Sequence, residues 1–65
     1  MTKTIHSISV PWRDLRDARD LLSRSADAAF EARPVGNRVV IDCERDADAQ
    51  RILEAFTHAR RFKAG

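Results

Sequence analysis

The stretch AAFEARPVGNRVVIDCE, residues 28–44, decides the fold. Its two halves alternate between apolar and polar residues on either side of Gly36 and Asn37, which form a two-residue turn with glycine in the first central position. The sequence therefore predicts a β-hairpin. Because such a turn fixes which residues oppose each other, Phe30 is expected opposite Cys43 and the apolar partners fall on one face. The other face of the hairpin is mixed and largely polar.

Pro34 indicates the order of the strands. In this hairpin its backbone nitrogen points away from the second strand, and a proline there is tolerated if the first hairpin strand is an edge. The second hairpin strand is then central. The β-prone segment 4–10, which ends at Pro11, is expected on its other side, parallel to the first hairpin strand. Numbered along the chain, segment 4–10 is strand one and the two hairpin strands are two and three. We expect a three-stranded sheet in the order one, three, two.

Two amphipathic segments supply the helices. Residues 12–26 and 46–61 carry apolar side chains at three- and four-residue spacing, with Asp46 as the expected N-cap of the second. The aromatic side chains Trp12, Phe30 and Phe56 are expected to face inward. The prediction is a single α+β domain over 1–65, with the order βαββα and both helices on one face of the sheet. This order resembles a split β-α-β unit, the ferredoxin-like plan without its fourth strand. The expected bounds are strand 4–10, helix 12–26, hairpin 28–44, helix 46–61 and C-terminal tail 62–65.

The small size of the chain favours association. A domain of 65 residues buries only about 60% of the surface that its unfolded chain exposes. The single cysteine, Cys43, cannot close an intramolecular disulfide, and no cluster of residues indicates a structural metal or a cofactor. We expect a cytoplasmic protein with no membrane segment, and we expect it to form a homodimer.

The charge balance argues only weakly for nucleic acid. The 12 basic and 10 acidic residues leave a net charge of +2, whereas phosphate binding needs positive charge concentrated on one face. The repeat RDLRDARDLLSR, residues 13–24, is expected to be one solvated helix face, with salt bridges at four-residue spacing such as Arg16 with Asp20. Its net charge of +1 is too small for a strong phosphate-binding strip.

Catalysis and base-specific RNA binding are not expected. No pair among His6, His58 and Cys43 sits at a spacing that enforces contact between a nucleophile and a base. Cys43 is expected to be a small buried apolar residue. The open face of the sheet is predicted to lack the aromatic side chains on which RNA bases stack.

The remaining functions are those of a binding surface. The outer edge of segment 4–10 is expected to be unpaired and open to another strand. Ile5 is expected to face outward beside Val40, giving a small exposed apolar patch. The predicted partner or dimer interface consists of Ile5, Ser7, Ser9, Arg38 and Val40.

We therefore expect a small non-enzymatic protein–protein interaction module, acting as a regulator, inhibitor or accessory subunit. The alternative is a nucleic-acid-binding module that uses basic side chains on backbone phosphates without base readout. The candidate contacts to phosphates or to an acidic partner are Arg13, Arg16, Arg24, Arg60, Arg61 and Lys63.

Overall fold

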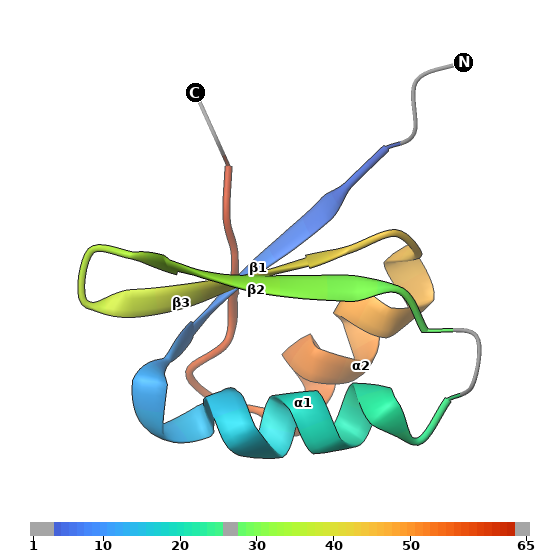
Figure 1. Cartoon of the computed structure of the whole chain (residues 1–65), viewed down its shortest axis with the longest axis horizontal. Coiled ribbons are helices and arrows are strands. Elements are labelled where there is room, and N and C mark those ends of the chain that lie inside the picture. The colour runs from blue at the N-terminus through green and yellow to red at the C-terminus, as the bar shows by residue number, and fades with distance from the viewer. Residues whose placement is uncertain (1–3, 26–27, 64–65) are drawn as a thin grey trace.

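The structure of the chain is a computed structural model that describes residues 4–25 and 28–63. Ala26, the predicted end of the first helix, and residues 64–65 of the predicted tail lie outside the described residues. The described elements are β1 (His6–Pro11), a 3₁₀ turn η1 (Trp12–Asp14), α1 (Leu15–Ser23), β2 (Phe30–Val35), β3 (Arg38–Cys43), α2 (Asp46–Ala55) and β4 (Arg60–Arg61) (Figure 1).

The sheet is antiparallel and has four strands in the order β2-β3-β1-β4. The predicted order of the first three strands is confirmed. The predicted three-stranded sheet is wrong, because residues 60–61 add a fourth strand beside β1. The chain thus has the element order βαββαβ, which is that of the ferredoxin-like plan with its last strand present.

The predicted hairpin is confirmed along both of its strands, including Phe30 opposite Cys43. Gly36 has a φ of 62°, in the left-handed region that glycine adopts without steric cost. Asn37 is not among residues of positive φ, which is the pattern of a turn that needs glycine at its first central position only. The residue types of the turn therefore determine the register of the two strands.

The predicted helix over 46–61 is wrong beyond Ala55, where α2 ends. Phe56 has an extended backbone, with φ −120° and ψ 118°, although its N–H still donates to the Ile52 carbonyl at 3.0 Å. A turn closed by the Ala59 N–H and the Phe56 carbonyl, 3.2 Å apart, then leads into β4. Phe56 and Ala59 both pack against the core. They therefore satisfy helical spacing without lying on a helix.

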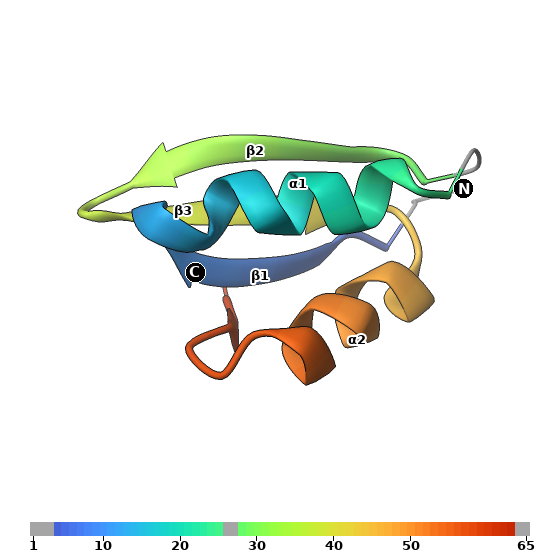
Figure 2. The ribbon, with the colours of Figure 1, turned by 90° about the horizontal axis from the view of Figure 1, so that it is seen from below.

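Both helices lie on one face of the sheet, as predicted (Figure 2). The core fills the space between these two layers, and removing its apolar surface from water is the main stabilising contribution to such a fold. Phe30 packs against this core as predicted. The buried residues of the core are Ile8, Val10, Ala18, Leu22, Val39, Ile41, Cys43, Ala49 and Ile52.

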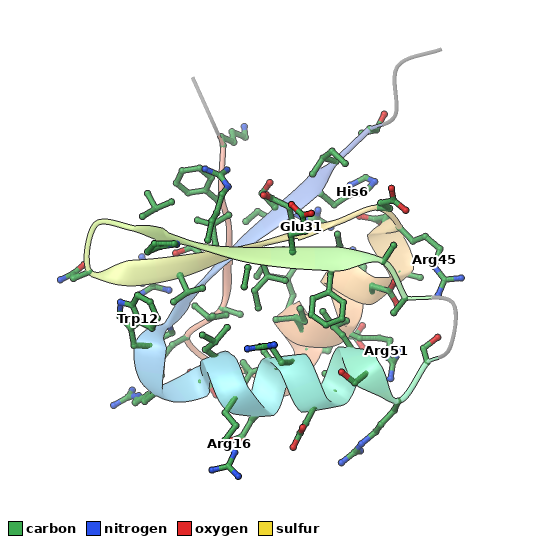
Figure 3. The ribbon with its side chains drawn as sticks, viewed as in Figure 1. His6, Trp12, Arg16, Glu31, Arg45 and Arg51 are labelled. Carbon is green, nitrogen blue, oxygen red and sulfur yellow. The ribbon has the colours of Figure 1, made fainter. Side chains whose placement is uncertain are left out.

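Asp48, near the start of α2, is a buried carboxylate that lies between two arginines. Its side chain is 2% exposed and lies 3.3 Å from Arg45 Nε and 3.8 Å from Arg51 Nη1. Arg51 Nη2 also donates to the Leu21 carbonyl at 3.3 Å, which ties α2 to α1 (Figure 3). A buried carboxylate needs such partners, because an unpaired buried charge is strongly destabilising. Arg45, and not Asp46 as predicted, occupies the N-cap position of α2.

Candidate functional site

The open face of the sheet, which neither helix covers, is organised around Asp42 on β3. Ser7 Oγ on β1 donates to Asp42 Oδ1 at 2.5 Å, and Arg33 Nε on β2 donates to Asp42 Oδ2 at 2.8 Å. Burial raises the pKa of Asp42, but the Ser7 hydroxyl and the Arg33 guanidinium outweigh it, and the pKa lies below its ordinary value of 3.8. The same contacts explain how the sheet tolerates Glu31 directly opposite Asp42.

Arg38, at the start of β3, joins the sheet to the turn that follows α2. Its Nε donates to Ser9 Oγ at 2.7 Å, and its Nη2 donates to the carbonyl oxygens of Ser9 and His58 at 3.1 and 2.7 Å. Ser7, Ser9 and Arg38 were predicted as interface residues. The structure brings them onto one face, where their polar groups already bond to other parts of the same chain.

The predicted apolar patch of Ile5 and Val40 is wrong. Ile5 is 49% exposed, but Val40 is fully buried although it lies on the open face. Arg33, which opposes Val40 in the register, extends over this face with its guanidinium carbon 5.7 Å from the centre of the Phe62 ring. Long side chains of the chain itself therefore lie where a partner was expected.

The outer edge of β1 was predicted to be unpaired, and this is also wrong. Ser9 opposes Arg60 of β4, and the Phe62 N–H donates to the Ser7 carbonyl at 2.9 Å. The edge that was expected to pair two copies is therefore occupied by the C-terminal segment. The homodimer itself stays a prediction.

The basic residues proposed for phosphate contacts do not form one strip. Arg61 Nη2 lies 3.0 Å from Asp46 Oδ1, and His6 Nδ1 lies 3.4 Å from the same oxygen. Arg61 thus holds β4 against the start of α2. Arg60 opposes Ser9, whose side chain is on the open face, whereas α1 covers the other face. Arg60 therefore lies on the opposite side of the sheet from Arg16 of α1.

The charged face of α1 is exposed as predicted, but its expected salt bridges are absent. Within the part of the chain that the structure describes, no ion pair joins Arg13 to Asp17, or Asp20 to Arg16 or Arg24. Arg16 points away from the sheet (Figure 3). Among the six basic residues predicted to contact phosphates or an acidic partner, five make no ion pair with another described residue. These five are Arg13, Arg16, Arg24, Arg60 and Lys63.

A hollow of about 360 Å³ lies along one flank of α1, next to Trp12. Trp12 was expected to face inward, and this is wrong, since it is 52% exposed. Trp12 lies in η1, a 3₁₀ turn with about three residues per turn, and not in the α-helix whose period of about 3.6 residues placed it on the apolar stripe. Spacing alone therefore missed the exposure of this residue. The hollow is lined by Trp12, Leu15, Arg16, Arg19, Asp20 and Ser23.

A second hollow, of about 450 Å³, lies at the end of the sheet where β2 begins and β3 ends. Asp42 in its wall is bonded to Ser7 and Arg33, and Glu44 also has an interaction of its own. Among residues 4–25 and 28–63, no group of acidic, histidine or cysteine side chains could hold a metal ion. The lining residues are Ile5, Ala28, Ala29, Phe30, Glu31, Asp42 and Glu44.

Cys43 is fully buried in the core, as predicted. Burial, together with Asp48 and Asp42, raises the pKa of the Cys43 thiol to about 11. The thiol therefore stays protonated at neutral pH, and it is the thiolate that acts as a nucleophile.

No helix in the described part of the chain is both long enough and apolar enough to cross a bilayer.

No protein-family model, curated protein or solved structure matches this chain. A function must therefore be argued from the exposed side chains. The open face and the β1 edge are engaged in contacts within the chain, and the flank of α1 around Trp12 is the most distinctive exposed surface.

Proposed function

We propose that this protein is a small non-enzymatic interaction module that docks on a larger protein as a regulator, inhibitor or accessory subunit. The observation that carries this proposal is Trp12, a large aromatic side chain that is 52% exposed beside a hollow. Tryptophan and arginine are enriched among the residues that dominate binding energy in protein interfaces. A reducing, cytoplasmic setting goes with this proposal, because the only cysteine is unpaired.

The lining of the hollow indicates the chemistry of the partner. Leu15 and Trp12 offer apolar surface, and Arg16 and Arg19 flank it with two positive charges against the single negative charge of Asp20. Neither arginine has an ion pair with another described residue. We infer a partner segment that inserts an apolar side chain and carries carboxylates on both sides of it.

Exposed basic residues without ion pairs favour one alternative, a module that binds nucleic acid through backbone phosphates. Arg13 in η1, Arg16 in α1 and Arg24 at the C-cap of α1 are exposed, and aspartates are their neighbours in the sequence. Arg60 lies across the sheet from them, and Arg61 is bonded to Asp46. This distribution supports the protein partner over the nucleic acid.

A comparative pull-down from the native host tests the docking surface. Bait proteins are the wild type, Trp12→Ala, and Ile5→Ala as the matched control, because Ile5 is the other large apolar residue that is about half exposed. Removing a hot-spot side chain costs about 2 kcal/mol, or roughly thirtyfold in affinity. We expect mass spectrometry to find partners that Ile5→Ala retains and Trp12→Ala loses.

Two results would contradict the proposal. In the first, the wild-type bait recovers nothing but itself. In the second, Trp12→Ala recovers the same proteins in the same amounts as the wild type while its far-ultraviolet circular dichroism shows that it is folded. A partner lost from Ile5→Ala alone would move the docking surface to the other hollow.

A further inference from the structure

We propose that two copies of this protein associate through the outer edge of β2, with Ala32 of one copy opposite Ala32 of the other. The two sheets then continue as one sheet. This inference goes beyond the docking of a larger partner and does not rest on it. β2 is the end strand of the sheet, at the opposite end from β4.

The outward backbone groups of β2 belong to alternate residues. In a hairpin with a two-residue turn, the pair next to the turn is hydrogen-bonded, and every second pair after it. The bond from the Glu44 N–H to the Ala29 carbonyl, at 3.1 Å, follows this alternation. Within the described part of the chain, no backbone hydrogen bond outside the β2–β3 ladder reaches a residue of β2. The residues whose backbone groups face outward are thus Phe30, Ala32 and, with its carbonyl only, Pro34.

The side chains along this edge are poorly covered. By the register, Ala32 and Pro34 lie on the helix face of the sheet, opposite Ile41 and Val39. Ile41 and Val39 are buried, yet Ala32 and Pro34 are exposed. The helices therefore do not cover the outermost strand, and another sheet placed at this edge removes its apolar side chains from water.

Charge selects the register between the two copies. With Ala32 opposite Ala32, Glu31 of each copy faces Arg33 of the other, and opposite charges facing each other stabilise a strand pair. Glu31 is exposed and makes no ion pair with another described residue. A shift by two residues in one direction places Glu31 opposite Glu31, and in the other direction Arg33 opposite Arg33. Both shifted registers are destabilised by like charges.

Pro34 lies at the two ends of the contact in this register. The N–H of each Ala32 donates to the carbonyl of the other Ala32, and the N–H of each Phe30 donates to the carbonyl of Pro34 in the other copy. The N–H that proline lacks leaves each Phe30 carbonyl without a donor, so one bond is missing at each end and the central pair of bonds is complete. Proline on an edge strand restricts pairing, and here it works against the shift that places Pro34 opposite Ala32.

A cysteine introduced at the centre tests the register. In a hydrogen-bonded antiparallel pair the Cα atoms lie about 5.5 Å apart, within the roughly 4.4–6.8 Å span of disulfides. We expect Ala32→Cys to form a disulfide-linked dimer under mild oxidation. Asn37→Cys is the exposed control, because Asn37 lies in the turn, and two such residues lie about 26 Å apart along the paired strands and stay unlinked. The native Cys43 is fully buried and adds no background.

Ala32→Pro tests the backbone bonds. It removes the outward N–H at the centre of the contact and leaves the β2–β3 ladder intact, as Pro34 does two residues further on. In sedimentation velocity, we expect the wild type to move from the mass of one chain toward that of two as concentration rises to about 1 mM, where a contact of millimolar affinity is half formed. We expect Ala32→Pro to stay at one chain, and Ala32→Val, which keeps the N–H, to behave as the wild type.

A wild type that stays at one chain over this range overturns the proposal. So does an Ala32→Pro variant that associates as strongly as the wild type, or an Asn37→Cys variant that crosslinks as readily as Ala32→Cys. A wild-type dimer in which Ala32→Cys gives no crosslink also overturns it, because the contact then lies elsewhere. None of these results bears on the hollow beside Trp12, whose lining comes entirely from residues 12–23.

Discussion

Asp42 is the residue at which the open face of the sheet can be titrated directly. Its carboxylate accepts hydrogen bonds from the Ser7 hydroxyl and the Arg33 guanidinium, and its pKa in the folded chain is lowered below 3.8. Because this pKa is lower than in the unfolded chain, the carboxylate stabilises the fold above pH 3.8. That stability is lost as the pH falls from 3.8 through the folded-state pKa.

We predict that an NMR titration of the Asp42 side-chain carbon gives a pKa below 3.8. Ser7→Ala removes one donor to the carboxylate and is expected to raise this pKa. We also expect Asp42→Asn to be less stable than the wild type at about pH 6, with the difference shrinking toward about pH 2. A measured pKa at or above 3.8, or one that Ser7→Ala leaves unchanged, contradicts this account.

At the scale of elements, the residues of the hairpin determine its structure locally, and those of the C-terminal segment do not. Gly36 and the alternation around it predicted the register, and Pro34 predicted the edge strand, because both depend on neighbouring residues only. β4 escaped prediction because its two residues carry no strand pattern, and Phe56 and Ala59 meet the core at helical spacing. The turn that follows α2 makes a long-range contact, from the Arg38 side chain to the His58 carbonyl, which local sequence patterns do not reveal.

The candidate site was predicted in part for the same reason. The sequence brings Ser7, Ser9 and Arg38 onto one face, since strand alternation places them there. It does not show that their polar groups bond to Asp42, to each other and to a distant turn. The exposure of Trp12 was missed because Trp12 meets the spacing of an α-helix but lies in a 3₁₀ turn, whose period is different.

Arg38 is predicted to hold the C-terminal segment in place. Arg38→Ala leaves the Ser9 and His58 carbonyl oxygens without their guanidinium donor, and hydrogen bonds to charged groups contribute about 1.5–3 kcal/mol when well shielded from water. For this partly exposed contact we expect a loss of about 1–2 kcal/mol in urea unfolding. The Phe62 amide, bonded to the Ser7 carbonyl, is expected to exchange with deuterium faster.

Arg38→Lys separates geometry from charge. Lysine keeps the positive charge, but its single ammonium group does not reproduce the planar fork that bonds two residues at once. We expect Arg38→Lys to lose most of what Arg38→Ala loses. Unchanged exchange at Phe62 in both variants shows instead that β4 is held without Arg38.

At the scale of the whole molecule, the helices cover one face of the sheet, and contacts within the chain occupy much of the other. The middle of the β1 edge, at Ile8 and Ser9, is paired with β4. The surfaces left for other molecules are the flank of α1 around Trp12 and the edge of β2. The two proposed surfaces are separate, so a second copy bound at the edge of β2 would leave the flank of α1 open to a different protein.

The distribution of charge over the whole molecule predicts weak binding to nucleic acid. Four exposed arginines without ion pairs, Arg13, Arg16, Arg19 and Arg24, lie along η1 and α1, whereas Arg60 lies on the opposite side of the sheet. One duplex therefore meets at most these four arginines. Each phosphate contact adds about 0.9 to the slope of log affinity against log salt concentration. We expect a titration with mixed-sequence DNA to give a slope no steeper than about −4. A double variant Arg60→Ala, Lys63→Ala is expected to bind as the wild type does. A slope near −5, with a loss of affinity in the double variant, would instead favour a nucleic-acid module with a continuous basic surface.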